Sequence, residues 1–351
     1  MLGRLLLRIL GFGAKGKLSS FPTELGASMD SASVAMAEMP AAVEPSPSDI
    51  GEASDKYSGT VKINSGVLRT MFEDFHAHRG TARGEEETGW LLIGRRESAG
   101  VVIEAALPPG EFRDAGVAHV NMNSTAQSVA MRILKKAHPD LDVLGVAHTH
   151  PGRLNRPSHG DYQGDSLWVP KLRKREGIFA IGVWDFDKTL NSGCDAAKYQ
   201  LEEDDGADVR GVCSSSHSSG RAHFFWFALA QGDGWYRHLS VEEMPGEDLG
   251  REIRGHWEVI EHFAGSIDRL VHMQPALQMG LIPLEMMEVP TMVLCQPLAR
   301  EGEELQVVLQ GREVGFFRMT PENPEEIVGP SERLDAAFYE VMARLARGAR
   351  K

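Results

Sequence analysis

Residues 148–161 read HTHPGRLNRPSHGD, and the interpretation of the whole chain starts from this stretch. It follows the apolar run LDVLGVA at residues 141–147, which predicts a buried strand. His148 and His150 are two residues apart at the end of that strand, so both imidazoles should point to the same side. Asp161 follows at the start of an expected helix, from which its carboxylate can return to the two histidines.

These residue types in this order predict a metal site. Two neutral imidazoles and one carboxylate make a three-ligand zinc site with one open position, which is the arrangement of catalytic zinc. Ser158 lies one helical turn before Asp161, so we expect it to face the same site and to donate a hydrogen bond to a developing negative oxygen. A base for a zinc-bound water should be an acid outside this segment, and Glu87, seven residues before Gly94, precedes another apolar run.

The surrounding sequence alternates helical and strand patterns. Residues 65–80 and 123–139 have helical spacing, the second with Asn123 or Ser124 as its cap. Strands are expected at 87–98, 100–109 and 175–185, and a hairpin at 223–244 should turn at residues 232–234. A further helix should carry an apolar face that consists of Ile253, Trp257, Ile260 and Ala264.

The pattern H-x-H-P-x6-S-x2-D, preceded by a strand that begins with Glu and ends at Gly94, resembles the signature of the JAMM (JAB1/MPN/Mov34) metalloproteases. The resemblance covers residues 62 to 243 and is greatest to a prokaryotic, deubiquitinase-like branch. It implies an α/β (α+β) fold of the cytidine-deaminase-like type, in which helices sandwich a mixed β-sheet. It also implies that His148, His150 and Asp161 bind one zinc ion per chain, with Ser158 as oxyanion donor and Glu87 as general acid/base.

The position of the glutamate departs from the family pattern. The family has glycine or another small residue three positions after this Glu, whereas Trp90 stands three positions after Glu87. Glu86 restores that spacing through Gly89, but then Gly94 falls out of step. We assign the role to Glu87 and keep Glu86 as the alternative.

The resemblance implies hydrolysis of the peptide or isopeptide bond after the C-terminal glycine of a ubiquitin-like protein. The expected partner is therefore a ubiquitin-like protein or its conjugate, with activating- and conjugating-enzyme-like proteins as further partners. The Ala, Gly and Arg usage is typical of bacteria, where such enzymes occur in some anti-phage defence systems. Two alternatives remain: a non-catalytic scaffold of the same fold, and a RadC-like protein associated with DNA, which shares a similar HxHP…SxxD stretch.

Composition excludes several classes of protein. The chain has 351 residues and a net charge of -13, which argues against nucleic acid as the main partner. No apolar run approaches the ~20 residues needed for a transmembrane helix. Three scattered cysteines, Cys194, Cys213 and Cys295, are too few for a disulfide framework. We therefore expect a cytoplasmic protein.

Changes in composition divide the chain. Residues 1–60 are expected to be disordered and of low complexity. The first seventeen are interpreted as a frayed, partly helical start, with an amphipathic membrane- or partner-binding segment as the alternative. Residues 61–245 form the predicted catalytic domain, with a flexible insertion at about 188–220, and 246–280 form a helical connector. Residues 281–351 predict a small α+β domain that ends in a helix capped by Ser331.

Overall fold

The computed structural model of the chain describes residues 60–348, apart from 98–99, 112–113, 117–119, 153, 186–198, 203–211, 218–219, 288, 322 and 328–332. The frayed, partly helical start predicted for the first seventeen residues, Cys194 and the predicted cap Ser331 lie outside the described residues. The described residues form two compact units that divide between Arg254 and Gly255. We call them the N-terminal unit and the C-terminal unit; residues 128–133 group with the second.

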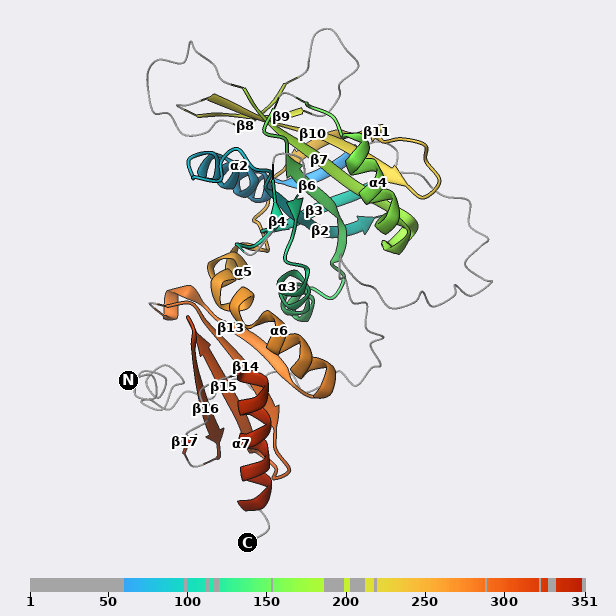
Figure 1. Ribbon diagram of the computed structural model, residues 1–351. Helices are drawn as coiled ribbons and strands as arrows, with labels where there is room; N and C mark the ends of the chain where they lie inside the picture. The colour runs from blue at the N-terminus through green and yellow to red at the C-terminus, as the bar shows by residue number, and fades with distance from the viewer. Residues whose placement is uncertain are drawn as a thin grey trace, which may run out of the picture. The chain divides into compact units, whose positions relative to one another are not determined.

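A ten-stranded mixed sheet is the framework of the N-terminal unit (Figure 1). Its order is β12-β1-β3-β2-β6-β7-β10-β9-β8, with β11 paired to β10. The strands are β1 (Thr60–Asn64), β2 (Gly89–Glu97), β3 (Gly100–Leu107), β6 (Asp142–Thr149), β7 (Glu176–Asp185), β8 (Tyr199–Glu202), β9 (Val212–His217), β10 (Gly220–Ala230), β11 (Arg237–His238) and β12 (Ser240–Met244). Neighbours are parallel in the pairs β1–β12, β1–β3 and β6–β7 and antiparallel elsewhere. A second, two-stranded sheet pairs β4 (Asp114–Ala115) with β5 (Val120–Asn121). The predicted mixed α/β class is confirmed.

The centre of the sheet is buried on both faces, which explains the unbroken apolar runs in β2 and β6. Gly145 of β6 pairs with Ile178 of β7. A Cβ atom at Gly145 would lie 1.6 Å from the carbonyl oxygen of Ile178. Only glycine therefore allows these two strands to approach this closely.

Helix α2 (Ser65–Arg79) covers one face of the sheet and supplies much of its core. Phe72 packs against Phe224 of β10 with ring centroids 5.1 Å apart, and Trp90 of β2 contacts the same ring. The indole Nε1 of Trp90 donates to Asp74 Oδ2 at 2.8 Å, so this large side chain is buried without losing its hydrogen bond. Trp90, the residue that departs from the family pattern, thus belongs to the core beneath α2.

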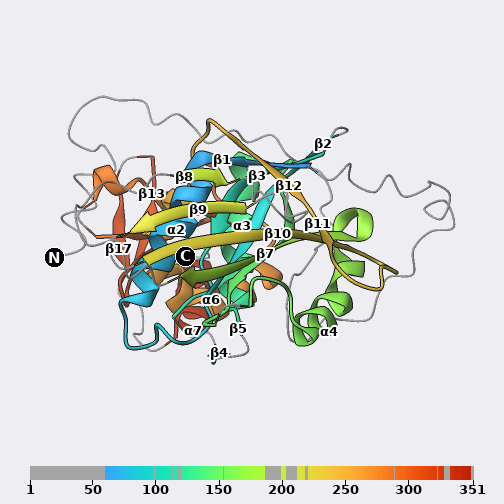
Figure 2. The same ribbon diagram turned by 90° about the horizontal axis from the view of Figure 1, so that it is seen from above.

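Helix α4 (His159–Trp168) lies on the opposite side of the sheet from α2 (Figures 1 and 2). Side chains alternate between the faces of a strand. Ala147 and Ala180 pair across β6 and β7 and belong to the core under α2, so the next pair, His148 and Ile181, faces the α4 side. Two 3-10 turns, Val169–Lys171 and Arg173–Arg175, connect α4 to β7.

Helix α3 (Ser124–Ala137) precedes β6, and the side chain of Asn123 accepts from the backbone N–H of Ala126 at 3.2 Å. Of the two predicted caps, Asn123 is therefore the one that acts. The stretch that sequence predicts as a flexible insertion contributes β8 and β9, which extend the sheet beyond β10. Short helix α5 (Arg251–Gly255) follows β12.

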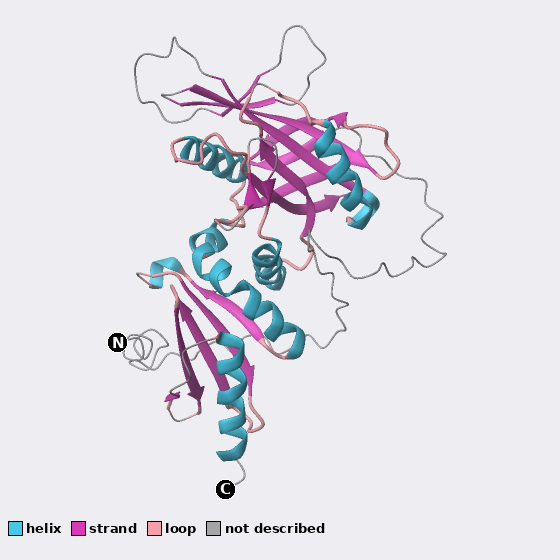
Figure 3. Cartoon of the chain, in the orientation of Figure 1, coloured by secondary structure: helices cyan, strands magenta, loops and turns pink. Residues whose placement is uncertain are grey.

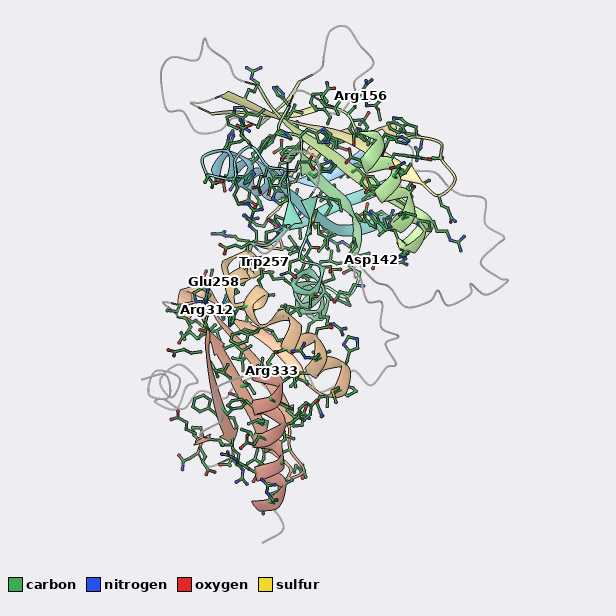
Figure 4. All side chains as sticks on the ribbon, in the orientation of Figure 1. Asp142, Arg156, Trp257, Glu258, Arg312 and Arg333 are labelled. Atoms are coloured by element: carbon green, nitrogen blue, oxygen red, sulfur yellow. The ribbon has the colours of Figure 1, made fainter. Side chains whose placement is uncertain are left out.

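The C-terminal unit contains a five-stranded antiparallel sheet in the order β13-β14-β15-β16-β17 (Figure 3). Its elements are α6 (Trp257–Met273), β13 (Gln278–Ile282), the 3-10 turn Leu284–Met286, β14 (Thr291–Pro297), β15 (Glu304–Gln310), β16 (Glu313–Met319), β17 (Glu325–Ile327) and α7 (Leu334–Gly348). Arg269 of α6 donates to Asp335 of α7 at 2.8 Å and ties the two helices together. Trp257 and Glu258 begin α6, and Arg333 directly precedes α7 (Figure 4). The domain limits at 245 and 280 stay predictions.

Among the described helices, none is long and apolar enough to cross a membrane.

Candidate metal centre

The two histidines stand where β6 leaves the sheet. His148 pairs with Ile181 of β7, and the backbone N–H of His150 donates to the carbonyl oxygen of Gly182 at 2.8 Å. Both side chains are buried, and their Nε2 atoms lie 3.2 Å apart. The loop that follows carries Arg156, which lies at the far end of β6 from Asp142 (Figure 4).

Asp161 reaches the histidines from the first turn of α4. The side chain of Ser158 accepts from the backbone N–H of Asp161 at 3.2 Å, and the Asp161 carboxylate accepts from the backbone N–H of Ser158 at 2.5 Å. This reciprocal capping box fixes both the start of the helix and the direction of the carboxylate. Asp161 Oδ1 consequently lies 3.2 Å from His148 Nε2, and Asp161 Oδ2 lies 3.4 Å from His150 Nε2.

The tautomer of His150 is set by the loop. Its Nδ1 lies 2.8 Å from the carbonyl oxygen of Leu154, which can only accept, so Nδ1 carries the proton. In the neutral ring Nε2 then presents a lone pair toward His148 and toward a carboxylate oxygen. Acceptors that converge in this way repel one another unless a cation, either a proton or a metal ion, lies between them.

The donor set fits zinc. Ligands bound to tetrahedral zinc at about 2.0–2.1 Å lie about 3.3–3.4 Å from one another. His148 Nε2 lies 3.2 Å from both His150 Nε2 and Asp161 Oδ1, which matches two edges of such a tetrahedron, and the other carboxylate oxygen, Asp161 Oδ2, lies 3.4 Å from His150 Nε2. Within the described part of the chain, His148, His150 and Asp161 are the one group of His, Cys, Asp or Glu whose ligand atoms converge in this way.

Electrostatics hold the triad in mutual contact. Burial on its own would lower the pKa of His148, but the hydrogen bond and the charge of Asp161 raise it above the ordinary value. Burial would likewise raise the pKa of Asp161, yet the hydrogen bond from His148, the influence of His150 and the hydrogen bond from the Ser158 backbone hold that pKa far below the usual range. The carboxylate is therefore ionised and ready to bind a cation.

Glu87 lies beside the histidines, and Glu86 does not. Gly89 of β2 pairs with His148, and the ladder continues because the backbone N–H of Thr149 donates to Thr88 at 2.8 Å. Continuing the same register places Glu87 opposite His150, on the face of the sheet that carries both imidazoles. Glu87 is 5% exposed, and its charge acts on His148. Glu86 instead accepts from Arg83 Nε at 2.6 Å in the preceding turn.

Ser158 lies directly beside the candidate ligands. Its Oγ accepts from the Asp161 N–H, so the hydroxyl proton is available to donate elsewhere. His159, the next residue, is exposed and stacks on Trp235, with centroids 6.5 Å apart and planes 10° apart. It contributes no ligand atom to the triad.

Sequence reasoning missed a polar pair one helical turn along α4 from Asp161, in which Tyr236 is buried and Asp165 is half-buried. Tyr236 donates to Asp165 Oδ2 at 2.6 Å, and Trp168 Nε1 donates to Asp165 Oδ1 at 3.0 Å. Burial raises the pKa of Asp165 to about 6, although both donors counteract it. Burial and the charge of Asp165 also raise the pKa of Tyr236. Asp165 follows Asp161 by four residues on one helix, and this spacing was the signal in the sequence.

One protein family matches the part of the chain that holds these residues. Residues 68–188 match the Prok-JAB family, described as prokaryotic homologs of the JAB domain. The match supports a JAB domain within these residues. The matched part of the chain begins within α2 and ends beyond β7, so it includes the three candidate ligands, Glu87 and Ser158.

Among solved structures, the chain is similar to the solution structure of protein DSY2949 from Desulfitobacterium hafniense. The identity is 19%, the match covers 53% of this chain and 94% of that chain, and the TM-score is 0.33. No curated protein matches the chain.

Proposed function

We propose that the chain is a zinc-dependent isopeptidase or peptidase that hydrolyses the bond after the C-terminus of a ubiquitin-like protein. The observation that carries the proposal is the convergence of three ligand atoms, from His148, His150 and Asp161, beside the buried carboxylate of Glu87. A bare metal-binding scaffold has no need of a buried acid on the same sheet face. The JAB domain supports the same reaction class by analogy.

Zinc in this site would supply Lewis acidity, which lowers the pKa of a water molecule from 15.7 toward roughly 7 and polarises the scissile carbonyl. Glu87 is the group that moves protons: it takes one from the attacking water and returns it to the leaving amine. Its burial keeps bulk water from competing for that proton. The Ser158 hydroxyl donates to the carbonyl oxygen as negative charge develops there.

The amine that leaves distinguishes two versions of the reaction. Release of a lysine side chain would be deconjugation, and release of a peptide would be precursor processing. Both need the same proton transfers, so the site supports them equally. Cytoplasmic activating- and conjugating-enzyme-like proteins would supply conjugated substrate, and they belong to this proposal as partners.

A panel of fusion proteins tests the proposal. Candidate ubiquitin-like proteins, each fused through its C-terminus to a reporter, are incubated with the purified chain, with and without a chelator, and the cut is located by mass spectrometry. Cleavage after the C-terminal residue of the ubiquitin-like part, abolished by the chelator and by Glu87→Gln but not by Glu86→Gln, is expected. A zinc-loaded protein that cleaves neither fusions nor isopeptide conjugates would favour the scaffold alternative, and zinc-dependent retention on DNA would favour the RadC-like alternative.

A further inference from the structure

Helix α4 carries a candidate metal ligand and packs on the sheet through partly buried side chains, such as Trp168 against Phe179 of β7. It has ten residues, and none of its side chains is fully buried. Isolated helices of this length are marginal in water, and packing of an apolar face normally supplies their stability. Some other restraint must therefore orient α4 and, with it, the carboxylate of Asp161.

The β10–β11 turn (residues 231–236) supplies polar restraints. Tyr236 OH donates to Asp165 at 2.6 Å, and Tyr162 OH of α4 donates to the backbone carbonyl of Asp233 at 3.0 Å. Each bond connects the helix to the turn, and each spans 71 residues of sequence.

The turn is itself rigidly attached to the sheet. Asp233 Oδ2 accepts from the backbone N–H of Ala230 at 3.1 Å and from Arg237 Nε at 3.3 Å. Tyr236 is 8% exposed, and its ring makes edge-on contacts with Phe179 of β7 and Phe227 of β10, with centroids 5.5 and 6.3 Å apart. The phenol hydroxyl is thus a fixed donor, aimed at a carboxylate one turn along from Asp161.

We infer that Asp165 and Tyr236 are positioning residues for the metal centre: their hydrogen bond sets the orientation of α4 and therefore the place of the Asp161 carboxylate against the two histidines. The inference requires metal binding by the triad and does not depend on which bond the protein cleaves. Outer hydrogen bonds that orient a metal ligand change metal affinity by about 10–100-fold when they are removed.

Tyr236→Phe is the sharpest test because it removes one hydroxyl and keeps the ring packing. The zinc dissociation constant of the full chain is measured by competition with a chromophoric chelator, and we expect it to rise about 10–100-fold. The absorption spectrum of the cobalt-substituted protein should change in the same variant, since the ligand geometry shifts. Tyr339→Phe, the same chemical change in α7 of the C-terminal unit, should alter neither quantity.

A double-mutant cycle separates positioning from general loss of structure. Asp165→Ala should weaken zinc binding as much as Tyr236→Phe does, and the double variant should be no worse than either single one. Zinc affinity within twofold of wild type in Tyr236→Phe would overturn the inference, and so would additive losses in the cycle. If Asp165→Ala fails to fold, Asp165→Asn replaces it: its amide oxygen still accepts, so it should bind zinc more tightly than Tyr236→Phe does, and equal weakening would overturn the inference.

The readouts distinguish this inference from the proposed function. Zinc affinity and the cobalt spectrum need no substrate, so a protein that binds zinc and cleaves nothing still tests the Asp165–Tyr236 pair. A wild-type protein that binds no zinc would overturn both.

Discussion

Nδ1 of His150 donates to the carbonyl oxygen of Leu154, four residues further along the same loop. This bond leaves Nε2 of His150 as the unprotonated atom that faces His148 and Asp161. The segment between β6 and α4 therefore does more than connect His148 in β6 to Asp161 in α4. It also selects the tautomer that a metal ion requires.

We expect His150→Ala to abolish zinc binding, because two remaining ligands cannot hold the ion at the affinity of three. Atomic emission spectrometry of the purified proteins should find about one zinc per chain in the wild type and none in this variant. His159→Ala is the matched control, since His159 lies in the same segment but outside the triad. Wild-type zinc content in His150→Ala would refute the ligand assignment.

Glu87→Gln should keep the zinc and lose catalysis. The amide preserves the size of the buried side chain but cannot accept and return a proton, so we expect kcat to fall about 10²–10⁴-fold. Single-turnover cleavage of a fusion substrate and zinc content are measured on the same sample. Glu86→Gln should have the zinc content and kcat of the wild type, because Glu86 pairs with Arg83 away from the ligands. A loss of activity in that variant alone would assign the general acid/base to Glu86.

Zinc affinity should rise with pH. Burial opposes protonation of His148, but Asp161 outweighs burial and raises the pKa of that imidazole above 6.5. Zinc must displace this proton, so below the raised pKa each pH unit should tighten binding by about tenfold. Dissociation constants measured from pH 6 to 8, with calorimetry in buffers of different ionisation enthalpy to count released protons, check this. A constant affinity with no proton release would contradict it.

Asp165 should make the metal-free protein less stable as the pH rises. Its pKa is raised from 3.8 to about 6 by burial, so its contribution to stability is fully present below pH 3.8 and is lost as the pH rises through about 6. The loss is on the order of 3 kcal/mol. Urea unfolding with chelator present should therefore show a decline between pH 4 and 7 in wild type that is smaller in Asp165→Asn. Parallel pH profiles in the two proteins would show that Asp165 does not titrate in this range.

Gly145→Ala should destabilise the N-terminal unit by several kcal/mol, because the added methyl group meets the Ile178 carbonyl and forces β6 away from β7. Gly164→Ala is the control on α4, where nothing lies within 4 Å of the added atom, and it should stabilise by about 0.5–1 kcal/mol. Thermal unfolding of the two variants measures both effects. An unchanged Tm in Gly145→Ala would mean that the two strands separate without cost.

The grouping of the three candidate ligands could be predicted from sequence because its geometry is local. His148 and His150 share a face through strand alternation, and Asp161 is directed by a capping box whose other member, Ser158, lies three residues away. The general acid/base, Glu87 with Glu86 as alternative, is less local, since its position depends on how the turn before β2 meets the end of β6. Trp90 stands where the family has a small residue, and its side chain packs in the core under α2.

Contacts between distant parts of the chain escaped sequence reasoning. The parallel pairing of β1 with β12 joins residues 180 positions apart, and no pattern in either strand specifies the other. Strand β8, YQLE, alternates over only four residues, and strand β9, VCSSSH, lacks the apolar alternation typical of a half-buried strand. The Tyr236–Asp165 hydrogen bond could not be predicted for the same reason. It joins the β10–β11 turn to α4, and only the folded sheet brings these two elements together.

None of the three candidate ligands belongs to the apolar core between α2 and the sheet. Chemistry and architecture are thus encoded separately in this chain. A single codon change at Asp161 or either histidine could remove the candidate metal site, and with it the proposed reaction, while the apolar core under α2 stays intact. If the proposed function holds, one substitution would therefore convert the enzyme into an inactive protein of the same fold. An inactive descendant would differ from its ancestor at a ligand position in the sequence and not in its fold.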